Sequence, residues 1–244
     1  MIIGAIAAAL AVSVVVAGIG GVIYLVAGRH PANAPGGEKF FLRSYLYLAT
    51  AIGLIIMLIG IAGLAKVTLG EVADRDFSYN VYPIPEPRPV PAEPTAPAEK
   101  PGAPPVESRD AQLLRRDKQI NREKKDDLIN GLTLAMVGAI VLGAHDLLRR
   151  RMESGLDSTQ NTLKRAFVFI MLVTLSIGSL VSLSTGISEL LRFYLVEPAA
   201  EFETKNPPGD KLGFAIAFVP VWIYFIFLAV RQYGRKGTPG GTPV

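Results

Sequence analysis

The chain has 244 residues, of which 50% are hydrophobic and 19% are charged, with a formal net charge of +4 and no cysteine. Its apolar residues form long runs and do not recur at the spacing of an amphipathic helix or strand, which excludes an ordinary water-soluble domain. The lack of cysteine excludes disulfides, thiolate metal sites and cysteine nucleophiles.

Five uncharged stretches follow one another along the chain: residues 1–28, 44–65, 128–144, 166–188 and 212–230. A helix needs about 20 apolar residues to cross a hydrocarbon core about 30 Å thick. The third stretch reaches this length only if its helix continues through His145 and Asp146 to Leu148, which puts both polar residues near the membrane surface. We therefore expect an all-α integral membrane protein with five transmembrane helices. Residues 1–28 lack the basic start of a signal peptide, so we expect them to be retained.

Lysine and arginine are concentrated in two short connections, 28–43 and 149–165, and in the tail 231–236. Five crossings put all three segments on one side, and the opposite connection 189–211 has five acids against three bases. The positive-inside rule then predicts an external N-terminus and a cytoplasmic C-terminus in a bacterial inner membrane. The loop 67–127, with twelve acids and ten bases, ends in basic clusters and has about the length at which the rule weakens, so its side stays open.

A short motif occurs twice, 122 residues apart. Arg43-Ser44-Tyr45-Leu46-Tyr47-Leu48 opens the second apolar stretch, and Arg165-Ala166-Phe167-Val168-Phe169-Ile170 opens the fourth. We interpret this as a duplicated helical hairpin. The expected organisation is a first hairpin (1–69), a proline-rich loop with a charged helical extension (70–127), a second hairpin (128–188), an external loop (189–211), and a fifth helix with a basic tail (212–244).

These arginine-led aromatic openings and the paired hairpins resemble a bacterial family of small multi-span membrane proteins known only as a domain of unknown function. The resemblance covers roughly residues 39–69 and 126–196. It implies an integral membrane location and no known activity.

Ten of the 23 residues 83–105 are proline, beginning with an alternation at Pro83, Pro85, Pro87, Pro89 and Pro91. Proline fixes φ and removes the backbone donor, so we expect a polyproline II strand that spans up to about 70 Å. Such a strand either contacts a partner protein or is a solvated spacer. Residues 109–127 are predicted to be a helical extension of the third membrane helix, and their nearly balanced charges argue against a nucleic-acid site or a polybasic lipid site.

His145 and Asp146 are the most suggestive pair for chemistry. His145 could bind the metal of a haem or a chlorophyll-type pigment or relay protons, whereas Asp146 has Arg149 and Arg150 at helical spacing for an interfacial salt bridge. Hydroxyls of the fourth helix are expected to bond to backbone or to a neighbouring helix, or to line a polar transport path. Trp222, beside Pro220, indicates an aromatic surface facing lipid, a partner or a quinone, and Gly60 and Gly63 indicate close helix packing.

No phosphate-binding loop, zinc-binding helix or dinucleotide fingerprint occurs, and only two histidines are present, so we expect no enzyme. The leading hypothesis is a non-catalytic accessory or structural subunit of a larger membrane assembly, of a respiratory or photosynthetic kind. Its partners would be other integral membrane subunits and lipid, contacted through the proline alternation and Trp222. The alternatives are a small transporter or channel built from the hairpins, and a pigment-binding or haem-binding subunit that uses His145.

Overall fold

The structure, a computed structural model, describes residues 37–79, 109–152, 158–196 and 206–234. These residues form helices and no strands: α2 (Gly37–Val72), the single turn α3 (Arg75–Ser78), α4 (Arg109–Met152), α5 (Ser158–Leu195) and α6 (Gly209–Gly234). The four long helices are each apolar enough over a sufficient length to cross a membrane. The all-α prediction is confirmed for these residues, with four of the five predicted spans. The first span and the proline alternation lie outside the described residues.

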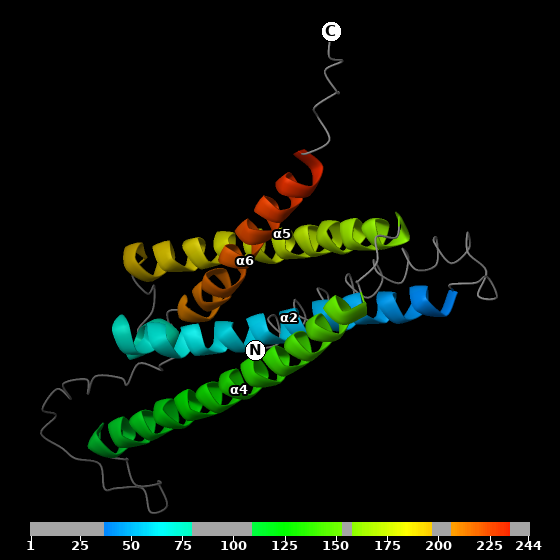
Figure 1. Cartoon of the computed structure of the whole chain (residues 1–244). Helices are drawn as coiled ribbons and strands as arrows, with labels where there is room; N and C mark the ends of the chain where they lie inside the picture. Colours follow the sequence, from blue (N-terminus) through cyan, green and yellow to red (C-terminus); the bar gives the residue numbers. More distant parts are fainter. Residues whose placement is uncertain (1–36, 80–108, 153–157, 197–205, 235–244) are drawn as a thin grey trace, which may run out of the picture.

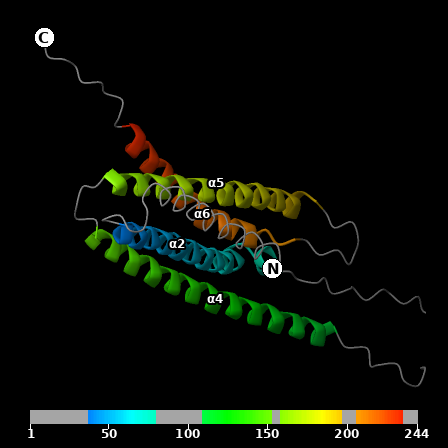
Figure 2. The same ribbon diagram turned by 90° about the vertical axis from the view of Figure 1, so that its right-hand side faces the viewer.

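The four long helices are stacked in the order α5, α6, α2, α4 (Figures 1 and 2). Helix α2 therefore has α4 on one side and α6 on the other, while α4 lies at the edge. Tyr45 meets His145 near one end of the α2–α4 pair, and Glu71 meets Lys124 near the other, so these two helices are antiparallel. Helices α5 and α6 are also antiparallel, and the chain alternates in direction as repeated membrane crossing requires.

This alternation collects the described basic connections at one end of the bundle, which we call the basic end. The groups there come from the start of α2, the end of α4, the start of α5 and the end of α6: Arg43, Arg149, Arg150, Arg151, Lys164, Arg165 and Arg231. The predicted gathering of these residues on one side agrees with this arrangement. The opposite end holds α3, the start of α4 and the start of α6.

The core is shared by α2, α5 and α6. Its most completely buried large side chains are Leu46, Ile55 and Leu58 from α2, with Met171 and Leu175 from α5. Because lipid tails are as apolar as leucine, such contacts stabilise the bundle through close packing more than through removal of apolar surface from water.

Helices α2 and α4 approach each other backbone to backbone at glycines. Gly53 and Gly60 on α2 are seven residues apart, as are Gly131 and Gly138 on α4. A Cβ atom added to Gly138 would lie 2.6 Å from the Cα of Met57, and one added to Gly60 would lie 2.7 Å from the carbonyl oxygen of Gly131. No side chain fits in these gaps, so the glycines allow the close approach. The predicted role of Gly60 in helix packing is confirmed.

All four long helices extend beyond their predicted membrane spans. Helix α4 begins at Arg109, where the charged helical extension was predicted, and that prediction is confirmed. Helix α5 continues to Leu195, so the predicted loop 189–211 is shorter than expected. A helix backbone satisfies its own hydrogen bonds and does not have to end where the hydrocarbon ends.

The proposed hairpin duplication is not shown by the structure. Tyr45 is 55% exposed whereas its aligned residue Phe167 is 8% exposed, and buried Tyr47 aligns with exposed Phe169. Helix α4 also packs mainly against α2, and its contact with α5, its predicted hairpin partner, is minor. Arginine and aromatic residues are common at any membrane surface, so short similar stretches can recur without a shared packing arrangement.

Candidate functional site

His145 lies on α4 near the basic end, and both of its ring nitrogens have partners. Nδ1 donates to the carbonyl oxygen of Val141 at 2.8 Å, which leaves Nε2 to accept from the Tyr45 hydroxyl at 3.4 Å. The Tyr45 and His145 rings also meet edge to face, with centroids 5.7 Å apart. A haem or pigment metal bound at Nε2 would have to displace Tyr45.

We expect the His145→Ala variant to have the same visible absorption spectrum as the wild-type protein, since Nε2 contacts Tyr45. The measurement is an absorption scan of both proteins, purified in mild detergent, before and after addition of haemin. Tyr45→Phe is the companion variant, because it frees Nε2 without removing the ring. A Soret band that is present in the wild type and lost only in His145→Ala would contradict this expectation.

Asp146 forms the predicted interfacial salt bridges with the next turn of α4. Its carboxylate contacts the Arg149 guanidinium and accepts from Nε of Arg150 at 2.7 Å. The two arginines differ in surroundings, since the Arg149 side chain is 18% exposed and that of Arg150 is 74% exposed. The pair of Asp146 with Arg149 is therefore the one that connects α4 to the rest of the bundle.

Arg149 joins three helices through its guanidinium. The group lies over the ring of Tyr47 on α2, 5.0 Å from its centroid, and over that of Phe167 on α5, at 5.8 Å. Phe167 in turn contacts Tyr47 at 5.1 Å and Phe225 of α6 at 6.3 Å between centroids. From the sequence, Arg149 was predicted to be a partner of Asp146 and one of the basic residues that set the orientation, but not to contact aromatic rings. The repeated arginine-aromatic motif was the available signal, but it does not say which rings face inward.

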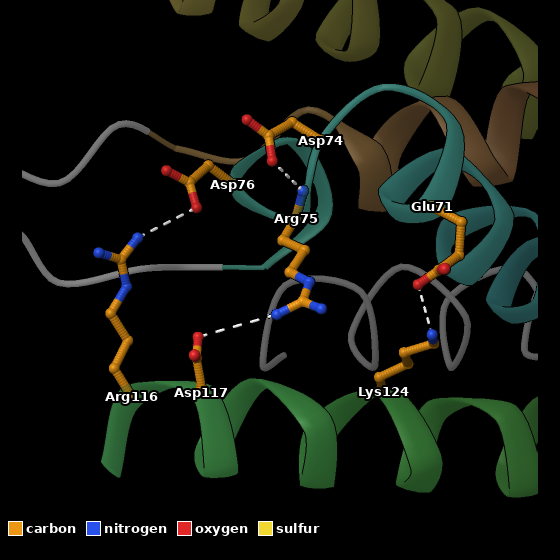
Figure 3. A network of polar contacts seen from close by, with 7 residues as sticks. All are labelled: Glu71, Asp74, Arg75, Asp76, Arg116, Asp117 and Lys124. Atoms are coloured by element: carbon orange, nitrogen blue, oxygen red, sulfur yellow. Dashed lines mark hydrogen bonds and ion pairs between the residues drawn. The ribbon is translucent and has the colours of Figure 1, made fainter. Parts of the chain in front are cut away.

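At the opposite end the extension of α4 is paired with α2 and α3 by a series of ion pairs, several of which are shown in Figure 3. Lys66 binds Asp127 at 2.8 Å, and the pairs farther along join Glu71 to Lys124, Arg75 to Asp117 at 3.8 Å, and Asp76 to Arg116 at 3.2 Å. Ion pairs exposed to water contribute little to stability, because water and salt screen their charges. Their antiparallel order nevertheless favours one register of α4 on α2.

Tyr79 follows α3 and is packed beneath this series, with a side chain only 3% exposed. The Lys66 ammonium lies 5.3 Å from the centre of its ring. Burial, followed by the nearby carboxylates of Asp127, Glu71 and Glu123, raises the pKa of Tyr79 to about 12. The phenol is therefore neutral at physiological pH.

This pKa predicts a loss of stability in alkali. Between pH 10 and about 12 the unfolded protein loses the Tyr79 proton while the folded protein keeps it, so the free energy of unfolding falls as pH rises through this range. We expect the Tyr79→Phe variant to lose less stability over that range than the wild type. Detergent-solubilised protein unfolded at pH 9, 10 and 11 gives the comparison. Equal slopes for the two proteins would contradict the assignment.

Three hydroxyl groups of α5, those of Ser176, Ser182 and Thr185, bond to their own helix or to α6, which is one of the predicted arrangements. Ser182 donates to the Gly178 carbonyl at 2.7 Å, and Thr185 donates to the Val181 carbonyl at 2.7 Å. Trp222 of α6 donates from Nε1 to the Ser176 hydroxyl at 2.6 Å. The polar edge of Trp222, predicted to face a partner, therefore points toward α5. Tyr224 and Phe227, which are 61% and 70% exposed, are the outward aromatic residues among the described side chains of α6.

The described residues contain no group of three or more histidines, cysteines, aspartates or glutamates placed to hold a metal ion. No protein-family model, curated protein or solved structure matches this chain. The resemblance to a bacterial membrane family of unknown function therefore stays a prediction. The packing of the helices is what bears on function.

Proposed function

We propose that the protein is a non-catalytic accessory or structural subunit of a larger membrane protein assembly. The observation that carries this proposal is the position of α4. Only 11% of the apolar membrane-spanning part of α4 is buried within the chain, whereas the buried share of the corresponding part of α2 is 44%. Helix α4 is held on one side by close glycine packing and presents the rest of its surface outward. A helix placed in this way is suited to bridging this chain and a neighbouring subunit.

The proposed orientation has the basic end in the cytoplasm of a bacterial inner membrane, because positive residues are retained on that side. The extension of α4 and the proline alternation at residues 83–91 would then lie on the external side. The proline alternation precedes α4 in the sequence, so we propose it as a second contact for a partner that binds the outer part of α4.

Purification from native membranes tests this proposal. The chain with a C-terminal tag, extracted in mild detergent, is expected to elute as a complex with at least one other integral membrane protein in a fixed ratio. Native mass spectrometry gives the masses and the stoichiometry, and an untagged strain is the control. A lone, monodisperse protein would count against an accessory role.

A small transporter or channel is the second candidate. The observation in its favour is that the Thr174 and Ser179 hydroxyls of α5 are buried without a hydrogen-bond partner among the described residues. A water-filled path would supply such partners. Because the chain has no cysteine, Ser179→Cys would carry the single thiol. Labelling of that thiol by a membrane-impermeant reagent would favour transport, whereas protection from the reagent would favour a dry helix interface.

A further inference from the structure

Helix α4 has a second continuous face, directed away from α2, which we call the outward face. It begins outside the membrane with the exposed bases Lys118, Arg122 and Lys125. It continues through apolar residues that are 51% to 68% exposed: Ile129, Leu132, Met136, Ile140 and Leu147. Steps of three and four residues connect these positions, apart from Ile140 to Leu147, where Gly143 occupies the intermediate position. This is the spacing of a face that packs along another helix.

The side of the α4 extension that faces α2 and α3 carries charges of both signs, and these are paired. Asp117 and Asp127 pair with Arg75 and Lys66, and Arg116 and Lys124 pair with Asp76 and Glu71. The bases of the outward face have no ion-pair partner among the described residues. A composition that looks nearly neutral along the sequence therefore contains a basic stripe on one side of the helix.

From these contacts we infer that the outward face binds a transmembrane helix of a partner protein that continues out of the bilayer and carries aspartate or glutamate on its extension. The inference rests on the proposed function as an accessory subunit. Helix α2 already binds the inward side of α4 in this manner, because Glu71 pairs with Lys124 beyond the apolar contact. The occupant of the outward face would repeat that arrangement with Lys118, Arg122 and Lys125.

Charge excludes the nearest alternatives. A second copy in the same membrane orientation, related by a two-fold axis along the membrane normal, would bring the three bases against three identical bases. Residues 1–28 of the chain contain no aspartate or glutamate that could pair with these bases. Lipid headgroups fit poorly as well, because α4 is one unbroken helix and its stripe rises about 10 Å from Lys125 to Lys118. Only the membrane-proximal base would reach the headgroups.

A binding assay with a defined probe tests the inference. The probe is a synthetic peptide with a leucine-alanine membrane span and a helical extension that carries glutamate at heptad positions. A control peptide has the same sequence except that glutamine replaces glutamate at these positions. The full chain carries a donor dye at Asn130→Cys, an exposed site away from the outward face, and is reconstituted with acceptor-labelled peptide in phosphatidylcholine vesicles. Energy transfer reports association.

We expect the glutamate peptide to bind about tenfold more tightly than the glutamine peptide, as three exposed ion pairs would produce. The triple variant Lys118→Gln, Arg122→Gln, Lys125→Gln is expected to remove this preference. The charge-retaining variant Lys118→Arg, Arg122→Lys, Lys125→Arg is expected to keep it. High salt should weaken the preference, since exposed pairs are screened.

Several results would overturn the inference. One is equal binding of the two peptides to the wild type, and another is an unchanged preference in the glutamine variant. Phosphatidylserine vesicles that bind the wild type but not the glutamine variant, with no peptide preference, would assign the stripe to lipid. Energy transfer between donor-labelled and acceptor-labelled copies of the chain would assign the face to self-association. The proposal that the protein is an accessory subunit is tested separately, because native mass spectrometry would show a lone protein if that proposal were wrong.

Discussion

Replacement of Gly138 by leucine is expected to detach α4 from α2 and to lower the free energy of unfolding by about 3 kcal/mol or more. The first side-chain atom at this position would already lie 2.6 Å from the Met57 Cα, and the two nearest atoms belong to the backbone, which cannot rotate away. The whole register of α4 on α2 depends on this approach. The effect therefore exceeds that of an ordinary overpacked core residue.

Gly143→Leu is the matched control, because a Cβ atom added there has no neighbour within 4 Å. Both variants place the same side chain on the same helix, so intrinsic helix propensity and hydropathy change equally. Reversible unfolding in mixed micelles, followed by circular dichroism, gives the two free energies. Similar destabilisation of both variants would mean that backbone contact at Gly138 is not what holds α4.

Replacement of Arg149 by glutamine is expected to lower the free energy of unfolding by about 2–4 kcal/mol. The change removes the inner partner of Asp146 and two cation–π contacts, to Tyr47 and Phe167, in a setting where the arginine is only 18% exposed. Lysine at this position restores the charge but not the planar group that stacks on the rings. We therefore expect Arg149→Lys to recover only part of the loss.

Arg150→Gln is the control for this prediction. It also removes a partner of Asp146, but the side chain is 74% exposed and no cation–π contact is described for it, so the expected change is about 0.5 kcal/mol or less. Unfolding of the three variants under one set of conditions, with Arg150→Gln as the reference, gives the comparison. Equal losses for Arg149→Gln and Arg150→Gln would show that the cluster contributes no more than a surface salt bridge.

Much of the architecture could be predicted because it depends on local properties. Hydropathy and length locate the membrane helices, and the distribution of basic residues indicates which connections share an end of the bundle. The start of the charged extension at Arg109 could be predicted because the residues from Arg109 onward favour helix and include no proline. The salt bridge of Asp146 follows from helical spacing alone.

The candidate sites were harder to predict, because they depend on which side of each helix meets which neighbour. The sequence treats Tyr45 and Tyr47 alike, yet one is exposed and the other is buried against Phe167. Likewise, Arg149 and Arg150 are adjacent bases, and only the first reaches the rings. Nothing local distinguishes the members of either pair.

Hydropathy and the distribution of charge along the chain indicate an apolar, multi-span helical protein with its basic connections at one end. Three other features depend on contacts between distant segments: the pairing of α4 with α2, the position of Arg149 among three helices, and the separation of the bases of the α4 extension into a paired side and an outward face. In a bilayer, apolar surface gains little by choosing protein over lipid, so the packing faces are selected by glycines and polar groups that meet only when distant segments come together.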